Sequence, residues 1–347
     1  MVTERWLAML AIAAAVLGGC PLDARDFGLA YTTEWQTDFR GQANWVNLLR
    51  ADFGLSLTSS LGVKAAAISV AKTREGRLMD DLLTFSNIEE DNVSLALAVC
   101  GLEWRVKRSA FFIGIRNVNE DYFTSECTSL FTNSSCGIFP TLSCNYPIAN
   151  YPLASVGLDY KLMWEHWTLE TSLYNGKGYN RFAGRQTVFR FCPRADGLFS
   201  ITSLNGRTDD GNYFSGFALY DGVPVADEGG NEEQAVAAQK KELNATWWAY
   251  AEQKLSPCLS ALVQYSFSTV RQGCRQYAGG GLVLHAGTTT GGLFVGYAGF
   301  TGRHEWACEA TWHIPCQRKG YIQPALHWVR NSYGGGVAGL LRLGIEI

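Results

Sequence analysis

A long polar stretch between two apolar runs carries the residues most able to contact a small solute. It extends from Asn117 to Leu153, and we expect it to fold inward and to form a constriction. Amide, hydroxyl and carboxylate groups exchange hydrogen bonds with a polar solute without making or breaking covalent bonds. The candidates are Asn117, Asn119, Glu120, Asn133, Ser134 and Ser135, with Phe131 or Tyr122 offering a ring face. The Asn-Ser-Ser phrase fits equally well a turn whose side chains bond their own backbone.

A second candidate set consists of charged residues that share one face of their predicted strands. An Arg and carboxylate set on such a face could order water and hold a hydroxyl-bearing solute. For any single residue, pairing with an opposite charge on the adjacent strand is the favoured interpretation. The set comprises Arg116, Asp159, Lys161, Glu170, Glu305, Glu309 and Arg342.

The sequence gives no indication of catalysis. It contains no Gly-x-Ser-x-Gly elbow, no phosphate-binding loop and no His-Glu-x-x-His site. The run Glu89-Glu90-Asp91 could suggest a glycosidase pair, but neighbours along a chain do not face each other across a sugar, so a solvated turn is preferred. Four histidines stand singly on predicted strands: His285, His304, His313 and His327. We therefore expect no enzyme activity, no cofactor and no metal site.

The residues above are positioned by apolar side chains that recur at every second residue, the period of a β-strand. In the last segment Leu341, Leu343 and Ile345 alternate with small or charged residues. Two runs between 153 and 173 flank a tight turn at Glu165-His166, which predicts a hairpin. Further runs lie near 27–36, 48–58, 63–72, 93–104, 109–118, 185–203, 212–220, 245–255, 259–269, 277–287, 291–300, 304–313 and 320–330. The total is about sixteen strands, each near the roughly nine to eleven residues that a tilted membrane strand needs.

This pattern favours an all-β fold, a transmembrane antiparallel β-barrel, over a soluble β-sandwich or propeller. The apolar faces often end in aromatic residues, as at membrane interfaces: Trp35, Trp104, Trp164, Trp167, Trp312 and Trp328. The opposite faces carry charges that a water-filled lumen tolerates and a dry core does not. No later segment reaches the run of about 18 apolar residues that a membrane helix needs, so a barrel is the remaining spanning structure. A helical period is found only near Glu232–Leu243, within the polar segment Asp221–Lys241.

The first residues are typical of an export signal. Arg5 precedes the apolar stretch Trp6–Val16, which is too short for a membrane-spanning helix of about 20 residues. We expect a signal peptide over residues 1–24, with lipidation of Cys20 as the alternative, and a single barrel domain over 25–347. The formal net charge of −3 argues against nucleic-acid binding. An exported protein meets an oxidising compartment, so a disulfide between two of three nearby cysteines (Cys127, Cys136, Cys144) is a further hypothesis.

Several phrases along the chain resemble the carbohydrate-selective porins of the OprB type. Three of them are Arg116–Phe123, Leu130–Ile138, which is similar to the family phrase LFxNSSFGI, and Asn150–Leu158, which contains Tyr-Pro-Leu-Ala. The others are Phe85–Glu89, similar to VSNIE, Ala249–Leu255, similar to AYxxAEQxL, and Tyr321–Val329, similar to LQPDLQYV. The matches run in order from about residue 27 to the end of the chain, and jointly they are specific.

The resemblance implies a passive channel for small neutral sugars such as glucose, set in the lipid of a Gram-negative outer membrane as a homotrimer or a monomer. This sequence departs from the family at several positions: Cys136 replaces a Phe, Ala325 and His327 replace Asp and Gln, and Ile347 ends the chain in place of an aromatic residue. The family's sugar preference is therefore not transferred. A general diffusion porin on the same scaffold and an exported soluble β-rich sugar-binding protein are the alternatives.

Overall fold

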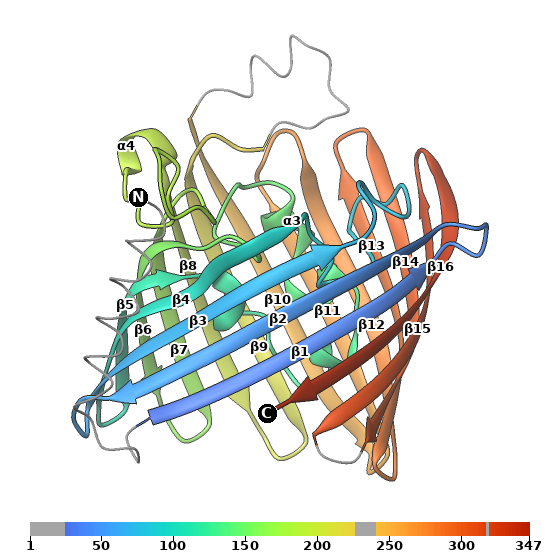
Figure 1. Ribbon diagram of the computed structural model, residues 1–347, viewed down its shortest axis with the longest axis horizontal. Helices are drawn as coiled ribbons and strands as arrows, with labels where there is room; N and C mark the ends of the chain where they lie inside the picture. The colour runs from blue at the N-terminus through green and yellow to red at the C-terminus, as the bar shows by residue number, and fades with distance from the viewer. Residues whose placement is uncertain (1–24, 226–240, 317–318) are drawn as a thin grey trace.

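The computed structural model describes residues 25–225, 241–316 and 319–347, and these form a closed barrel of sixteen antiparallel strands (Figure 1). Each strand pairs with its neighbours in the chain, and β1 pairs with β16 to close the barrel. The strands are β1 (Arg25–Thr37), β2 (Ala43–Ser56), β3 (Leu61–Lys72), β4 (Val93–Val106), β5 (Ser109–Arg116), β6 (Ser155–Met163), β7 (Trp167–Asn175), β8 (Leu198–Arg207), β9 (Gly211–Gly222), β10 (Glu242–Ser256), β11 (Leu259–Ser268), β12 (Cys274–Ala286), β13 (Thr289–Phe300), β14 (Arg303–Cys316), β15 (Gly320–Asn331) and β16 (Gly334–Glu346). The predicted barrel of about sixteen strands is confirmed.

The alternation of side chains along each strand separates two surfaces. On β16 the side chains of Leu341, Leu343 and Ile345 are exposed on the outside, whereas Leu340 and Arg342 are buried on the inside. The same parity places all six tryptophans predicted for the membrane interfaces on the outer surface, where each is 37% to 53% exposed. An apolar exterior and a closed hydrogen-bond ladder are what a lipid environment requires. The chain is therefore a transmembrane β-barrel. No helix among the described residues is both long and apolar enough to cross a membrane.

The connections between strands differ at the two ends of the barrel. At one end they are short: residues 107 and 108 join β4 to β5, and the predicted turn at Glu165-His166 joins β6 to β7. At the other end they include three long loops, residues 73–92, 117–154 and 176–197, which lie at the top and inside of the barrel in Figure 1. The helical turns η2 (Val118–Glu120), η3 (Thr128–Leu130), α2 (Ser134–Gly137) and α3 (Pro140–Ser143) belong to the second loop, and α4 (Pro193–Asp196) belongs to the third.

Some predicted boundaries were wrong. The run expected near 185–203 begins as a strand only at Leu198, because Pro193 starts the helical turn α4 and Gly197, with a φ of 81°, ends it. The helical period expected over Glu232–Leu243 falls mostly outside the described residues, and its end belongs to β10, where Leu243 pairs with Asp221. The hypothesis of a disulfide is also contradicted, because the nine cysteines of the described ranges are all free thiols.

Substitution of Val295 by arginine should weaken the barrel, because this side chain is 46% exposed on the outer surface near the middle of β13. Placing a charge on the lipid-facing surface at the centre of a bilayer costs about 2–4 kcal/mol. The free energy of unfolding in lipid vesicles, measured by urea titration, should fall by this amount. Thr288→Arg, in the exposed turn before β13, is the matched control and should have little effect. Equal losses in both variants would contradict the placement of β13 in the bilayer.

Candidate functional site

The connection of residues 117–154, hereafter the long inner loop, lies inside the barrel. Near its start, the Tyr122 hydroxyl is 2.8 Å from Ser172 Oγ on β7 and donates to the Ile201 carbonyl on β8 at 3.2 Å. Further along, Thr141 Oγ1 donates to Ser266 Oγ on β11 at 2.8 Å. The loop thus contacts the wall at strands far apart in the chain, and its role as a constriction stays a prediction.

Two buried glutamates, four strands apart on the wall, hold the middle of the long inner loop. Glu309 on β14 accepts hydrogen bonds from the Thr132 backbone N–H at 2.8 Å, from Thr132 Oγ1 at 2.9 Å and from the Asn133 backbone N–H at 3.0 Å. Glu252 on β10 accepts from the Cys127 backbone N–H at 2.7 Å and from the Ser125 hydroxyl. Each of these carboxyl groups accepts hydrogen bonds from backbone N–H groups of the loop that would otherwise be buried without a partner. These carboxylates therefore fix the loop in place.

Apolar packing completes the attachment of the long inner loop. Phe131 is fully buried and its ring centroid lies 5.1 Å from that of Phe294 on β13, while Phe139 packs against Trp248 and Tyr277 of the wall. Neither Phe131 nor Tyr122, which is also buried, presents a free ring face to the lumen. The expectation that one of them stacks on a solute is wrong, because the same rings supply the contact between loop and wall.

The Asn-Ser-Ser phrase forms the start of α2. Asn133 Oδ1 accepts hydrogen bonds from the Ser135 backbone N–H at 2.9 Å and from Ser135 Oγ at 2.6 Å, as a helix-capping residue does. Asn133 and Ser135 are both buried. The interpretation as a local turn is therefore confirmed for these two side chains. Ser134 alone of the three is half-buried and borders open space.

A second inward connection, residues 73–92, was not predicted; we call it the short inner loop. Glu305 on β14 accepts from the backbone N–H groups of Leu82 at 2.6 Å and Leu83 at 3.1 Å. On the other side, Arg342 Nη2 donates to Asn87 Oδ1 at 2.6 Å and Arg342 Nε donates to Glu34 Oε1 at 2.6 Å. Glu305, Glu309 and Arg342, predicted as solute contacts, are instead buried and hold the two inner loops, which corrects their proposed role.

The predicted solvated turn Glu89-Glu90-Asp91 lies in the short inner loop and is only partly solvated. Asp91 is exposed, but Glu89 is buried and Glu90 is half-buried. Asn44 Nδ2 on β2 donates to Glu89 Oε1 at 3.3 Å. The prediction is wrong for Glu89 because the loop turns into the barrel and brings this carboxyl against the wall.

A cavity of about 880 Å³ lies between the two inner loops. Polar and apolar groups line it about equally. The polar ones are Asn87, Asn119, Ser134, Asn150 and Tyr151, the acidic residues Asp80, Glu89 and Glu90 and the basic residues Arg77 and Arg303. Asn119 connects the parts of the long inner loop, since its Oδ1 accepts from the Tyr151 backbone N–H at 3.0 Å. We call this cavity the vestibule because it opens at the end of the barrel that carries the long loops.

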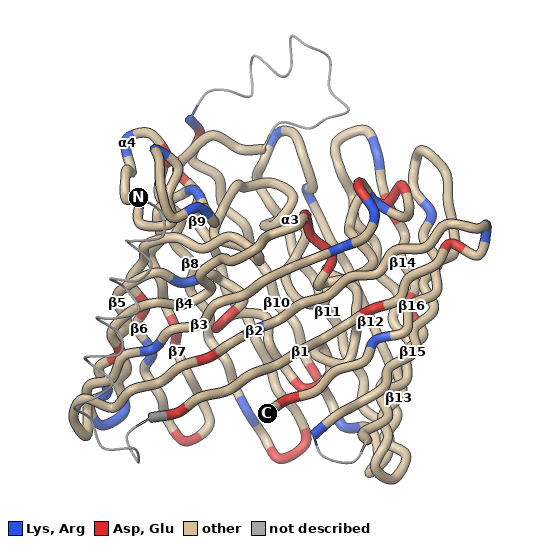
Figure 2. The backbone as a smooth tube through the Cα atoms, viewed as in Figure 1, with Lys and Arg blue, Asp and Glu red and all other residues tan. Residues whose placement is uncertain are grey.

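Charged side chains remain partly exposed on the inner surface of β2 to β6, the part of the wall that the apolar core of the long inner loop does not cover. Arg50 on β2 reaches Glu120 of that loop at 2.7 Å and Asp52 at 2.7 Å, and these three side chains are 30%, 16% and 45% exposed. Lys64 on β3 lies 2.7 Å from Glu103 on β4. Figure 2 shows residues of both signs interspersed along these strands. The remaining lumen is thus polar, and its cations lie in contact with carboxylates.

Four of the predicted wall residues meet at one place. Lys161 Nζ lies 2.6 Å from Asp121 Oδ1 of the long inner loop and 2.8 Å from Glu170 Oε1, its partner on β7, and Arg116 also contacts Asp121. Asp159 accepts from Ser172 Oγ at 2.9 Å. The favoured interpretation, pairing across the wall, is confirmed here. The carboxylate oxygens of Asp121, Asp159 and Glu170 lie within 4.8 Å of one another, but the Lys161 ammonium already supplies the positive charge at this point.

Of the predicted solute contacts, Asn119, Glu120, Ser134 and the partly exposed Lys161 border open space, whereas Arg116 and Asn117 are buried at the root of the long inner loop. Sequence reasoning missed Arg50, Asp52, Lys64 and Glu103. The signal was available, because each of them occupies an inward position in an alternating run.

The short inner loop should respond to pH through Glu89. Burial raises the pKa of the Glu89 carboxyl to about 7; the carboxylates Asp81 and Glu34 act in the same direction, and the cations Lys72 and Arg77 oppose it. A raised pKa means that the folded loop favours the protonated form. The stability that this provides is complete below the ordinary carboxyl pKa, near 4.5, and is lost as the pH rises through about 7.

Raising the pH from about 5 to about 8 should therefore place a negative charge on Glu89 and increase the preference of the channel for cations over anions. Reversal potentials in a salt gradient across a planar bilayer measure this ratio. The Glu89→Gln variant should keep the low-pH ratio throughout. An identical pH dependence in both proteins would assign the titration to another group.

Comparison with known proteins gives structural matches only. No family model matches the chain, and no match was found among the curated proteins. The high-pH structure of Pseudomonas putida OprB superposes with a TM-score of 0.78 at 13% identity, covering 93% of this chain and 94% of that one. A mutant of the Rh. blastica porin gives 0.61 at 9% identity (93% and 100% covered), and a loop-deletion mutant of OmpT, an outer membrane protein of Vibrio cholerae, gives 0.62 at 8% (93% and 99%). The chain therefore has the porin fold.

Proposed function

We propose that this protein is a passive channel through which small neutral carbohydrates diffuse across the outer membrane. Closed antiparallel barrels with an apolar exterior are the integral proteins of that membrane. This chain is such a barrel and crosses the membrane many times. Residues 1–24, which lie outside the described ranges, are proposed as the export signal. No catalytic step, cofactor or resident metal enters the proposal.

One observation carries the preference for neutral solutes. The cations on the inner wall of β2 to β6 each contact a carboxylate: Arg50 with Glu120, Lys64 with Glu103 and Lys161 with Glu170. Such pairs present donors and acceptors side by side, an arrangement that matches the hydroxyl groups of a sugar, each of which both donates and accepts. The partners of sugar hydroxyls would be the exposed edges of these pairs, first of all Arg50 and Glu120.

The vestibule gives a solute a first place to exchange water for protein hydrogen bonds. Its amides, from Asn87, Asn119 and Asn150, both donate and accept. Binding must stay weak at each place, because a solute held tightly does not leave. Similarity to OprB at 13% identity supports the choice of carbohydrate as the solute class only together with these residues.

The test is swelling of liposomes that contain the purified, refolded protein. Glucose is compared with a disaccharide and with gluconate, an anion of similar size to glucose. Entry of glucose several times faster than gluconate supports the sugar channel. Entry rates that depend only on solute size would make the protein a general diffusion porin. If well-folded protein gives no swelling with any solute, the channel itself is refuted.

A further inference from the structure

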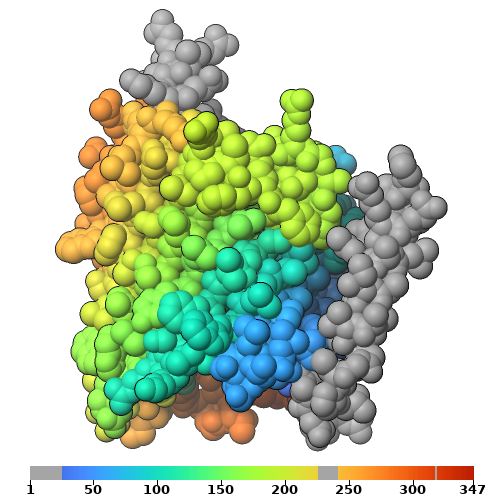
Figure 3. Space-filling view, turned by 90° about the vertical axis from the view of Figure 1, so that its left-hand side faces the viewer, coloured from blue at the N-terminus to red at the C-terminus, as the bar shows by residue number. Residues whose placement is uncertain are grey.

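The outer surface of the barrel is grooved over β4 to β8, the part of the wall that faces the viewer in Figure 3. A depression of about 860 Å³ runs between the aliphatic side chains of Leu102, Ile113, Leu158 and Leu173 and the aromatic rings of Trp104 and Phe111. Its floor is low because Thr171 and Ser200, both small, occupy outward positions on β7 and β8. The Thr171 and Thr202 hydroxyls lie 2.9 Å apart and satisfy each other. The groove is thus apolar, and these hydroxyl groups on its floor need no hydrogen bond from water.

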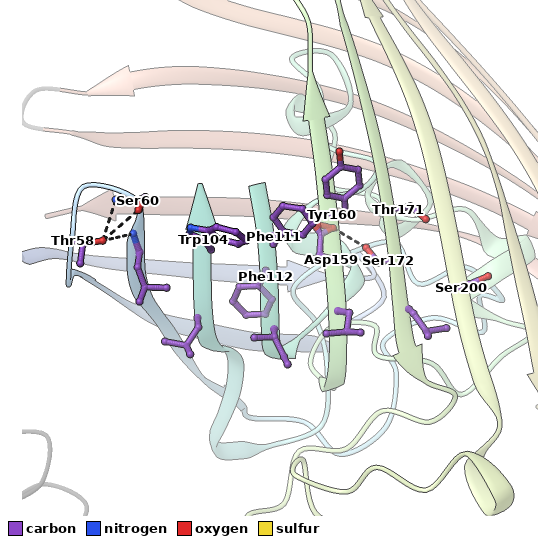
Figure 4. Close-up of a pocket in the computed structure, with 15 residues that line it drawn as sticks. Thr58, Ser60, Trp104, Phe111, Phe112, Asp159, Tyr160, Thr171, Ser172 and Ser200 are labelled. Atoms are coloured by element: carbon purple, nitrogen blue, oxygen red, sulfur yellow. Dashed lines mark hydrogen bonds between the residues drawn. The ribbon is translucent and has the colours of Figure 1, made fainter. Parts of the chain in front are cut away.

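Three aromatic rings close the groove toward the short-turn end of the barrel (Figure 4). Trp104 and Phe111 are stacked with ring centroids 5.6 Å apart, and the Phe111 and Tyr160 centroids lie 4.7 Å apart. The Tyr160 hydroxyl meets Ser109 Oγ at 3.3 Å. Trp and Tyr side chains on the outside of a barrel gather at the level of the lipid headgroups, so Trp104 and Tyr160 mark that level here. The aliphatic part of the groove therefore lies at the depth of acyl chains.

The groove continues past the rings to two cations that form no ion pair with another described residue. A second depression, of about 490 Å³, shares Trp104 and Phe111 with the first and is bordered by Lys107 and Arg108, which form the turn between β4 and β5. Arg108 also borders a third depression, beside Trp167. Both cations are exposed, and neither is among the ion pairs of the described residues. The neighbouring Arg105, in contrast, is paired with Glu103 at 2.7 Å.

We propose that this groove binds a phospholipid with an anionic headgroup from the periplasmic leaflet. The acyl chains lie along the aliphatic part, and the phosphate and its headgroup are held by Lys107 and Arg108. Short turns of such barrels face the periplasm, so the cations stand at the headgroup level of that leaflet. Apolar grooves flanked by basic residues are suited to anionic lipids, and within the described ranges no carboxylate pairs with Lys107 or Arg108.

The experiment compares lipid binding of the folded full-length protein in detergent micelles by native mass spectrometry. Phosphatidylglycerol and phosphatidylethanolamine with identical acyl chains are the probes. Wild type should bind phosphatidylglycerol about tenfold more tightly, since each cation near the lipid surface contributes to its attraction. The double variant Lys107→Asn with Arg108→Gln should bind both lipids equally. Asparagine is chosen because Lys107 has a φ of 52°, a region that asparagine tolerates.

A matched control removes the same charge elsewhere on the same rim. Lys319, with a φ of 64°, and Lys254 are exposed near other short turns, and Lys319→Asn with Lys254→Gln should keep the wild-type preference. Heat-modifiable gel mobility verifies that every variant is folded. An undiminished preference in the Lys107/Arg108 variant, or none in wild type, overturns the proposal. If wild type gives masses of two or more chains and the Lys107/Arg108 variant does not, the groove binds a second copy of the chain instead of a lipid.

Discussion

Substitution of Arg50 by alanine is expected to raise the single-channel conductance by roughly a factor of two and to slow glucose entry relative to gluconate. The guanidinium reaches from β2 to Glu120 on the long inner loop, where Nη1 and Nη2 donate to the two carboxylate oxygens at 2.7 and 2.9 Å. Its removal widens the lumen at this point and leaves Glu120 and Asp52 without their shared cation. Conductance in planar bilayers and swelling of liposomes measure the two effects.

Two further variants separate position from charge. Arg50→Lys keeps the charge but loses the paired donors that meet both Glu120 oxygens, so we expect conductance near wild type with reduced sugar selectivity. Lys254→Ala removes a cation from the rim of the barrel, outside the narrow region, and should change neither quantity. If Arg50→Ala leaves both conductance and selectivity unaltered, the narrowest point lies elsewhere in the lumen.

Substitution of Glu309 by alanine should release the long inner loop from β14. The change removes the acceptor of three hydrogen bonds and leaves the backbone N–H groups of Thr132 and Asn133 buried without partners. Unsatisfied buried groups cost about 1–3 kcal/mol each, so the local stability of the loop should fall by about 3 kcal/mol or more. The barrel itself should persist, because its ladder of main-chain hydrogen bonds does not involve this side chain.

The measurement combines limited proteolysis with conductance. Protease should cut Glu309→Ala within residues 117–154 about a hundred times faster than wild type or more, as a loss of about 3 kcal/mol in local stability requires, and its open-channel current should become noisy. Glu309→Gln keeps one acceptor oxygen and should fall between the two. Glu346→Ala, at the exposed end of β16, is the control for loss of a glutamate from the wall. Wild-type cleavage in Glu309→Ala would show that apolar packing around Phe131 alone holds the loop.

The barrel was predictable because its cause is local. Period-two alternation places Leu341 outside and Arg342 inside whatever the rest of the chain does. The inward direction of Asp159, Lys161 and Glu170 follows from the same parity. What parity does not determine is which inward groups stay in contact with water.

That question depends on where the two inner loops settle, and their contacts join residues far apart in sequence. Glu309 meets Thr132 across 177 positions, and no local pattern indicates this pairing. The same holds for Phe131, whose aromatic ring in a polar loop suggests a solute contact but packs against Phe294 of β13. Arg50, by contrast, lies in the predicted run 48–58 at an inward position and was overlooked rather than hidden.

The anchors of the inner loops also bear on how the barrel is assembled. The long inner loop follows β5, yet Glu252 and Glu309, its main acceptors, belong to β10 and β14. The loop therefore has no site to dock on until most of the later hairpins are in place, and such distant contacts form late. A chain halted before β14 could neither close the barrel, which needs β16, nor hold this loop at Glu309. The last strands therefore close the wall and hold the inner loop in the lumen at the same stage of assembly, so the native barrel closes with its loop in place.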